Sequence, residues 1–294
     1  MSLLVNCLGY RKVKGSISTV PNLKTIRQFN PKLKREITFS IHSPKCANVS
    51  PYIFIYSHGN GDNICDCKQL MDAHSRIFKS VFVCYDYLGY GETSGRATEQ
   101  SSIVICEHVL NYVQQTYKNS KIVLWGRSIG SVPTVAVGSD PRVSCIIVES
   151  GLSTALSAAC TSPFCSCIDG FKNINRLENV NCPILLMHAL DDDTIPYRCS
   201  LQNFEILKRK QQCYRNEDSL FSEQINSCNN IMQSGNNWHY TFKTGGHNDL
   251  NENETAQIVN RFLINAFRTQ ENERKSVKTE PNFKGKDKLI VSYI

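Results

Sequence analysis

A serine, a histidine and a group of aspartates stand in the sequence where they could support nucleophilic catalysis. Ser128 lies between two glycines in Gly126-Arg-Ser-Ile-Gly130, the G-x-S-x-G spacing that exposes a serine on a sharp turn between a strand and a helix. A serine hydroxyl attacks a carbonyl efficiently only when a base removes its proton and an acid orients that base. The stretch therefore predicts acyl transfer through Ser128, with the base and the acid supplied from elsewhere in the chain.

The base and the acid are expected in loops that follow later strands, because reactive groups in parallel sheets lie beyond the carboxyl ends of the strands. His247 follows the last apolar strand pattern, after two glycines that permit a turn, and we predict it as the base. Asp191, Asp192 and Asp193 follow the preceding strand pattern. Their spacing alone leaves all three open as the acid, and their order before His247 fits the chain order Ser, Asp, His.

Two backbone amides are predicted to bind the oxyanion of a tetrahedral intermediate. One belongs to Ile129, which follows the serine at the start of a predicted helix, where amides and the positive end of the helix dipole face a developing negative charge. The other is assigned to Asn60, in the loop His58-Gly-Asn-Gly61 that follows a predicted strand. Small residues in that loop would let a backbone amide face the site.

The elements that must position these residues follow from hydrophobic periodicity. Short apolar runs predict strands, and apolar residues at helical spacing between them predict helices. The alternation of the two favours an α/β fold, with a mostly parallel sheet that helices cover on both faces. The strands are predicted at residues 34–42, 52–57, 81–85, 121–125, 143–148, 183–188 and 238–243.

The domain organisation is predicted as one α/β domain over residues 34–268. A lead-in at residues 1–33 precedes it, and a basic tail at 269–294 follows it. Residues 150–181 are expected to form a short cap. Residues 211–237 are rich in Asn, Gln and Ser and are expected to form an insertion or a loop.

Composition narrows the class of protein. The hydrophobic content of 41% and the charged content of 20% are ordinary for a globular protein, so neither a disordered nor a membrane-embedded class is indicated. The net charge of +7 comes partly from basic residues near both ends, and we read it as solvated charge, with no nucleic-acid partner expected. No signal-peptide pattern begins the sequence, so a cytoplasmic location is expected.

The cysteines indicate free thiols and a candidate acylation site, and not a metal site. The fourteen thiols are expected to be free in a reducing compartment. They lack the Cys-x-x-Cys pairs and histidine partners of a zinc site, so no metal is expected. Cys7 stands close to Arg11 and Lys12 and is a candidate for S-acylation beside a basic patch.

Four motifs, in this order, resemble the α/β-hydrolase-domain proteins of the palmitoyl-protein depalmitoylase branch. They are Ser57-His-Gly-Asn60, Asp86-Tyr-Leu-Gly-Tyr-Gly91, Gly126-Arg-Ser-Ile-Gly130 and Gly246-His-Asn-Asp249. The resemblance covers about residues 34–268. It implies an α/β-hydrolase fold with a short cap and a serine hydrolase that removes fatty acyl thioesters from proteins, without a cofactor.

The resemblance also separates the three aspartates. Members of the branch place the acid two residues before a Val-Ile pair, which Thr194-Ile195 matches here. This implies Asp192 as the acid and leaves Asp191 and Asp193 as solvated or turn-capping residues. Relatives in the branch also carry an acylated N-terminal cysteine cluster, of which this chain offers only Cys7.

Several functions remain open for this set of residues. A carboxylesterase, a monoacylglycerol lipase or a serine peptidase of the same fold would use the same serine, acid and base, and a non-catalytic binding protein is a further alternative. The expected partner is an acylated protein or a lipid-like ester, with peripheral association at the cytosolic face of membranes as an option. The apolar residues of the cap that could contact an acyl chain are Leu152, Leu156, Phe164, Ile168 and Phe171.

Overall fold

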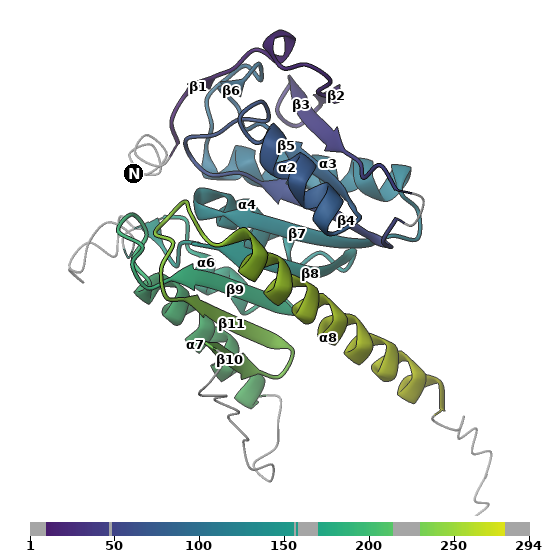
Figure 1. The fold of residues 1–294 in the computed structure, drawn as a ribbon, viewed down its shortest axis with the longest axis vertical. Helices are drawn as coiled ribbons and strands as arrows, with labels where there is room; N and C mark the ends of the chain where they lie inside the picture. Colours follow the sequence, from purple (N-terminus) through teal and green to yellow (C-terminus); the bar gives the residue numbers. More distant parts are fainter. Residues whose placement is uncertain (1–9, 47–48, 156, 158–169, 214–229, 280–294) are drawn as a thin grey trace, which may run out of the picture.

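The chain folds around a nine-stranded sheet that is parallel at its centre (Figure 1). The computed structural model describes residues 10–46, 49–155, 157, 170–213 and 230–279. The strand order is β10-β11-β9-β8-β7-β4-β5-β3-β2. The six strands from β11 to β5 in this order pair in parallel, whereas β10, β3 and β2 pair antiparallel at the two edges.

The strands of this sheet are β2 (Thr25–Asn30), β3 (Arg35–His42), β4 (Tyr52–Ser57), β5 (Val81–Tyr85), β7 (Lys121–Arg127), β8 (Val143–Glu149), β9 (Ile184–Ala189), β10 (Ile231–Ser234) and β11 (Asn237–Phe242). The helices are α2 (Lys68–Ile77), α3 (Glu99–Thr116), α4 (Ser131–Val137), α6 (Asn173–Leu177), α7 (Arg198–Cys213) and α8 (Glu252–Thr279), with short 3-10 turns η1 (Ile17–Thr19) and η2 (Ser128–Gly130). A separate two-stranded pair joins β1 (Val13–Lys14) to β6 (Tyr90–Gly91).

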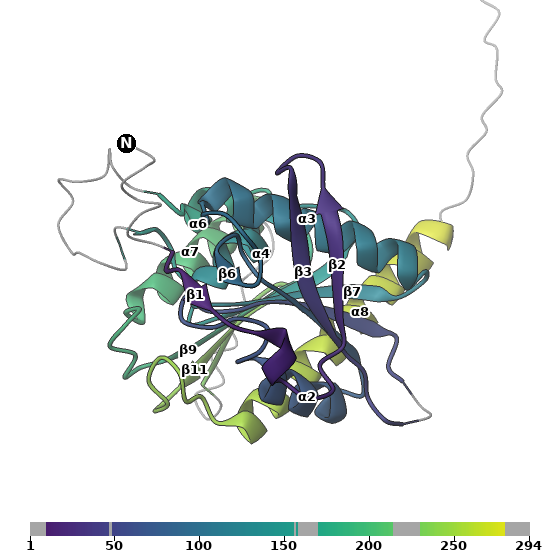
Figure 2. The same ribbon diagram turned by 90° about the horizontal axis from the view of Figure 1, so that it is seen from above.

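Helices cover both faces of the sheet, as the alternating pattern predicts. Figure 2 shows α2 and α8 below the sheet and α3, α4, α6 and α7 above it. Strand β7 is buried on both faces of the sheet, and this burial explains the unbroken apolar run from Ile122 to Trp125. Ile122 and Leu124 point into the core on one face, whereas Val123 and Trp125 point into the core on the other. Because successive side chains of a strand alternate between faces, a strand buried on both faces has no polar positions.

The structure differs from the expected elements at three places. Strand β2 lies within the residues predicted as a lead-in, and its alternating exposure gives only a weak apolar signal in the sequence. Strand β10 lies in the stretch expected to be an insertion or loop, and it pairs along β11 after a turn at Gly235. Helix α8 continues to Thr279, well into the residues expected to form a tail. The division of the chain into three segments stays a prediction.

The expected cap is described only at its two ends. Residues 150–155 leave strand β8, and α6 leads back towards β9. Leu156, Phe164 and Ile168 lie outside the described residues, and Leu152 and Phe171 are buried. Within the described part of the chain, no helix has both the length and the apolar character needed to cross a membrane.

Candidate active site

Ser128 sits on a strained turn between β7 and α4. Its φ of 54° lies in the left-handed region, which a residue with a side chain adopts only when the surroundings enforce it. The two flanking glycines explain how the turn closes. A Cβ on Gly130 would stand 2.0 Å from the carbonyl oxygen of Ser57, and a Cβ on Gly126 would stand 2.4 Å from the carbonyl oxygen of Gly130. Only glycine allows these backbones to approach so closely.

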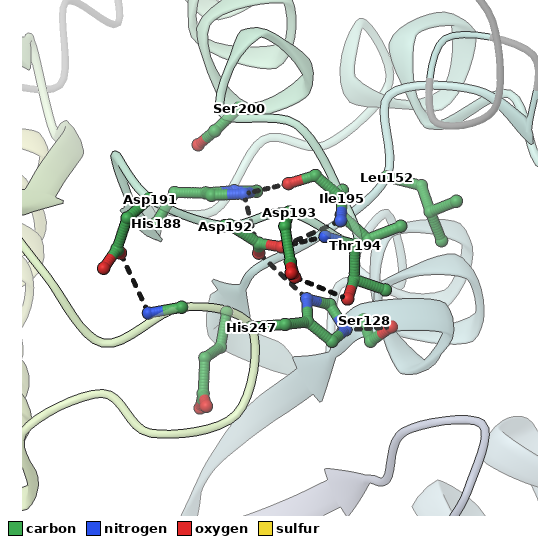
Figure 3. A network of polar contacts seen from close by, with 12 residues as sticks. Ser128, Leu152, His188, Asp191, Asp192, Asp193, Thr194, Ile195, Ser200 and His247 are labelled. Carbon is green, nitrogen blue, oxygen red and sulfur yellow. Dashed lines mark hydrogen bonds and ion pairs between the residues drawn. The ribbon is translucent and has the colours of Figure 1, made fainter.

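The structure brings together the predicted serine, histidine and aspartate (Figure 3). The hydroxyl of Ser128 lies 3.0 Å from Nε2 of His247, and Nδ1 of His247 lies 2.8 Å from Oδ2 of Asp192. The three side chains follow β7, β11 and β9, whose carboxyl ends meet at one edge of the sheet. With the ring proton on Nδ1, the imidazole donates to the carboxylate and can accept the serine proton on Nε2.

Asp192 is the aspartate that faces His247, and its surroundings keep it charged. Its Oδ1 accepts from the backbone amides of Thr194 and Ile195, at 3.0 and 2.8 Å. Its Oδ2 faces both His247 and His188, whose Nε2 lies 3.1 Å away. Burial alone raises the pKa of Asp192, but the hydrogen bonds from the two histidines and from Ile195 outweigh it and hold the pKa well below its usual range.

The two neighbouring aspartates do not reach the imidazole of His247. Asp193 accepts from the hydroxyl of Thr194 at 3.2 Å. Asp191 caps a turn, as expected, but the turn lies in the loop of residues 245–248 around His247, which we call the histidine loop. Its carboxylate accepts from the amides of Gly246 and Gly245 at 2.9 and 3.3 Å. A turn so distant in sequence could not be foreseen from local spacing.

The loop that carries Asn60 borders the nucleophile. A Cβ on Gly59 would lie 3.9 Å from Cβ of Ser128, so the loop after β4 passes beside the serine. The side-chain oxygen of Asn60 accepts from the hydroxyl of Tyr90 at 2.6 Å and from the amide of Arg11 at 2.9 Å. These bonds fix the conformation of Asn60. That its amide and the amide of Ile129 bind an oxyanion stays a prediction.

Residues of the Asp86–Gly91 motif contact the loop that carries Asn60. The hydroxyl of Tyr87 donates to the carbonyl of His58 at 2.7 Å. The fully buried carboxylate of Asp86 accepts from the amide of Ile64 at 2.9 Å and lies 3.5 Å from Nε2 of His58. A Cβ on Gly91 would stand 2.1 Å from this carboxylate, which explains the glycine.

The His58–Asp86 pair makes stability depend on pH. Burial alone lowers the pKa of His58, but the Asp86 carboxylate outweighs it and raises the pKa from 6.5 to about 9. The folded state therefore keeps a proton that the unfolded state releases. This stabilisation is complete below about pH 6.5 and declines as the pH rises towards 9. His42, His74 and His239 have pKa values that burial lowers, so they add stability as the pH rises through 6.5 and offset part of this decline. We therefore expect the urea midpoint of the wild type to fall more, or rise less, between pH 6.5 and 8.5 than that of Asp86→Asn.

A matched control for this measurement is Asp72→Asn, because Asp72 pairs with His42 at 2.7 Å and that histidine has a lowered pKa. This variant should keep the wild-type decline. The range ends at pH 8.5 because buried thiols with raised pKa values add their own pH dependence above it. An equal pH dependence of the urea midpoint in wild type and Asp86→Asn would contradict the assignment of a charged His58.

The sheet order, the serine turn and the residues that meet at the strand ends are those of the α/β-hydrolase fold. Its structure is similar to that of an esterase from Pyrococcus furiosus, with a TM-score of 0.62 over 87% of this chain and 98% of that one, at 13% sequence identity. At this identity the likeness shows the fold alone. The predicted α/β-hydrolase fold is thereby confirmed.

In sequence the chain is similar to the alpha/beta hydrolase domain-containing proteins 17. It is 29% identical to protein 17C of Mus musculus over 187 residues, which are 62% of this chain and 58% of that protein. It is 28% identical to protein 17B of Homo sapiens over 169 residues, 56% of this chain and 58% of that protein. The chain thus spans somewhat over half the length of the curated relatives it matches. No protein-family model matches the chain.

Proposed function

We propose that the protein is a serine hydrolase that works through an acyl-enzyme on Ser128. The observation that carries the proposal is the chain of hydrogen bonds from Asp192 through His247 to Ser128, with distances of 2.8 and 3.0 Å. An unrelated function would not require a strained serine, a histidine and a buried, charged carboxylate at the ends of three strands.

The mechanism follows from these positions. The oxygen of Ser128 attacks the acyl carbon while Nε2 of His247 takes the hydroxyl proton. The amides of Asn60 and Ile129 bind the oxyanion that forms. When the intermediate collapses, His247 returns the proton to the leaving thiol or alcohol. Water then attacks the acyl-enzyme while His247 takes a proton from it. The second intermediate collapses, the bond to Ser128 breaks, the carboxylic acid leaves, and His247 returns the proton to the serine oxygen. Asp192 stabilises the imidazolium in both halves of the reaction.

The substrate class we propose is a long-chain acyl group, held as a thioester on a protein cysteine. The resemblance of four motifs to the palmitoyl-protein depalmitoylase branch supports the thioester. An apolar cluster beside the site supports the long chain. Its buried members are Ile129, Val132, Leu152, Phe171, Ile195 and Cys199.

This cluster is continuous with the proposed machinery. Ile129 follows the nucleophile, and the amide of Ile195 binds Asp192. Leu152 and Phe171 come from the two described ends of the cap, and both are among the cap residues predicted to contact an acyl chain. The buried members are at most 8% exposed, so an acyl chain that packs against them has to displace the side chains that now cover them. It gains about 0.8 kcal/mol for each methylene it buries.

Efficiency should rise with the length of the acyl chain. We expect kcat/KM for acyl thioesters to increase from short to long chains and to exceed that for aminoacyl amides on the purified protein. Leu152→Ala should lower kcat/KM for the long-chain substrate about tenfold, since a leucine side chain contributes about 1.5 kcal/mol or more when it is buried. The same variant should change the value for a short-chain substrate much less.

Leu207→Ala is the matched control, because Leu207 is equally apolar and buried in a different core cluster on α7. It should destabilise the protein without altering the ratio between long and short substrates. A preference for short esters would favour a carboxylesterase, and a preference for amides would favour a peptidase. Either result would overturn the substrate proposal and leave the proposed mechanism on Ser128 in place.

A further inference from the structure

The residues beside the serine and beside the histidine are linked to each other. Arg127 precedes Ser128, and Asn248 follows His247. Nη2 of Arg127 donates to Oδ1 of Asn248 at 2.6 Å and to its backbone carbonyl at 3.2 Å. This contact joins two residues that are 121 positions apart and runs alongside the 3.0 Å contact between Ser128 and His247.

Arg127 is itself held from the sheet. Its Nε lies 3.6 Å from Oε1 of Glu149, at the end of the neighbouring strand β8, and Oε2 of Glu149 accepts from the indole of Trp125 at 2.9 Å. The side chains of Arg127 and Glu149 are only 14% and 13% exposed. Burial opposes the charge on the guanidinium, but Glu149 raises the pKa of Arg127 further above its usual value. The donor is therefore permanently charged and has little freedom to move.

The histidine loop needs such support because two glycines precede His247. Gly245 and Gly246 have φ values of 133° and 54°, and glycine loses more backbone entropy on ordering than any other residue. Asp191 holds these glycines through their amides, at 3.3 and 2.9 Å. Arg127 holds the residue on the other side. His247 is thus the single residue between two contacts, one with Arg127 at the end of β7 and one with Asp191 in the loop after β9.

We propose that Arg127 is a positioning residue, which acts through Asn248 and together with Asp191 to keep His247 within reach of Ser128. This inference rests on the proposed function of that pair. We call the two contacts, Arg127 with Asn248 and Asp191 with Gly245 and Gly246, the histidine clamp. Neither contact occupies Nε2 of His247 or the hydroxyl of Ser128, so the clamp sets the geometry of the base and leaves the reacting atoms free.

The test is to break the clamp while keeping the reacting groups. Arg127→Gln should lower kcat about 10- to 100-fold and change KM less than threefold, because a misplaced base slows the proton transfer and not the binding of substrate. Asn248→Ala loses one of the two acceptors and should lower kcat about fivefold. Asn248→Asp keeps an acceptor for the guanidinium and should retain wild-type kcat. If residue 248 mattered only for stability, Asn248→Ala would lower the urea midpoint and leave the kcat of the folded protein unchanged.

Combining variants separates the two contacts. Arg127→Gln with Asn248→Ala should be no slower than Arg127→Gln alone, because both variants break one contact. Asp191→Ala should lower kcat about tenfold, and its effect should multiply with that of Arg127→Gln, since the two contacts are separate. The rate of Ser128 modification by a fluorophosphonate should fall in parallel with kcat in every variant, because that reaction uses the same base.

The matched control is Arg142→Gln, because Arg142 makes a similar bridge far from the site. It donates to Asn111 and Asp140, both at 2.7 Å. This variant should keep kcat, and urea unfolding measured on all variants would separate stability from rate. If Arg127→Gln and Asn248→Ala keep wild-type kcat while Ser128→Ala is inactive, the clamp is refuted and the proposed function stands. If Ser128→Ala keeps full activity, the proposed function is refuted first.

Discussion

Ser128→Ala should abolish hydrolysis, lowering kcat by about four to six orders of magnitude, and should remove labelling by a fluorophosphonate probe. The hydroxyl of Ser128 lies 3.0 Å from Nε2 of His247. Alanine lacks this hydroxyl, so the base has no proton to remove and no nucleophile forms. The fold should be kept, because alanine is smaller and the turn is enforced by the close approach of Gly130 to Ser57. The measurement is turnover of a long-chain acyl thioester, together with gel detection of the probe.

His247→Ala should cost a comparable factor, because groups that act as one unit lose most of their effect when any one is removed. Ser139→Ala is the matched control. Ser139 is exposed and donates only to the carbonyl of Ala136, one turn earlier, so its variant should label and turn over like the wild type. Equal labelling of Ser128→Ala and wild type would exclude Ser128 as the nucleophile, and the chain would then be a binding protein or use another residue.

Asp192→Asn should lower kcat by about four orders of magnitude while the protein stays folded. The asparagine carbonyl can still accept from the amides of Thr194 and Ile195, which bind Oδ1 of Asp192 at 3.0 and 2.8 Å. Its amide group, however, would face Nδ1 of His247 in place of the carboxylate oxygen. The imidazole would then turn to the wrong tautomer, with its proton on Nε2, and could not accept the serine proton.

The same prediction has a consequence for the pH profile. Because the pKa of Asp192 is held well below its usual range, this carboxylate remains ionised throughout the range in which the protein can be assayed. Asp192 should therefore contribute no step of its own to the pH profile of kcat/KM in that range. Asp192→Asn should lower kcat/KM throughout the same range.

Asp193→Asn is the control for the acid, since Asp193 is exposed and bonds only the hydroxyl of Thr194 in the structure. It should keep turnover within a factor of about two. Full turnover in Asp192→Asn, combined with a severe loss in Asp191→Asn or Asp193→Asn, would show that the acid had been assigned to the wrong residue.

The elements that the sequence predicts are those whose burial or backbone contacts require a particular pattern of neighbouring residues. Strand β7 is buried on both faces, so it reads as an apolar run, and the glycines around Ser128 are required by backbone contacts within the turn itself. Strands β2 and β10 lie at sheet edges, where one face meets water and pairing to a neighbour supplies most of the order. Their sequences therefore carry little apolar pattern. Helix α8 continues to Thr279, but residues 269–279 are mostly polar, so no apolar stripe in the sequence marks this end of the helix.

The sequence by itself determined the α/β class, the loops that carry Ser128, Asp192 and His247, and the order in which they occur, because periodicity and glycine spacing are local properties of the chain. Residue spacing left open which of the three carboxylates faces the imidazole, and the family resemblance implied Asp192. Only the tertiary structure decided that Asp191 binds the amides of the histidine loop and that Arg127 reaches Asn248. These are contacts between residues 54 to 121 positions apart. They depend on the order and register of β7, β9 and β11, which no local pattern of residues encodes.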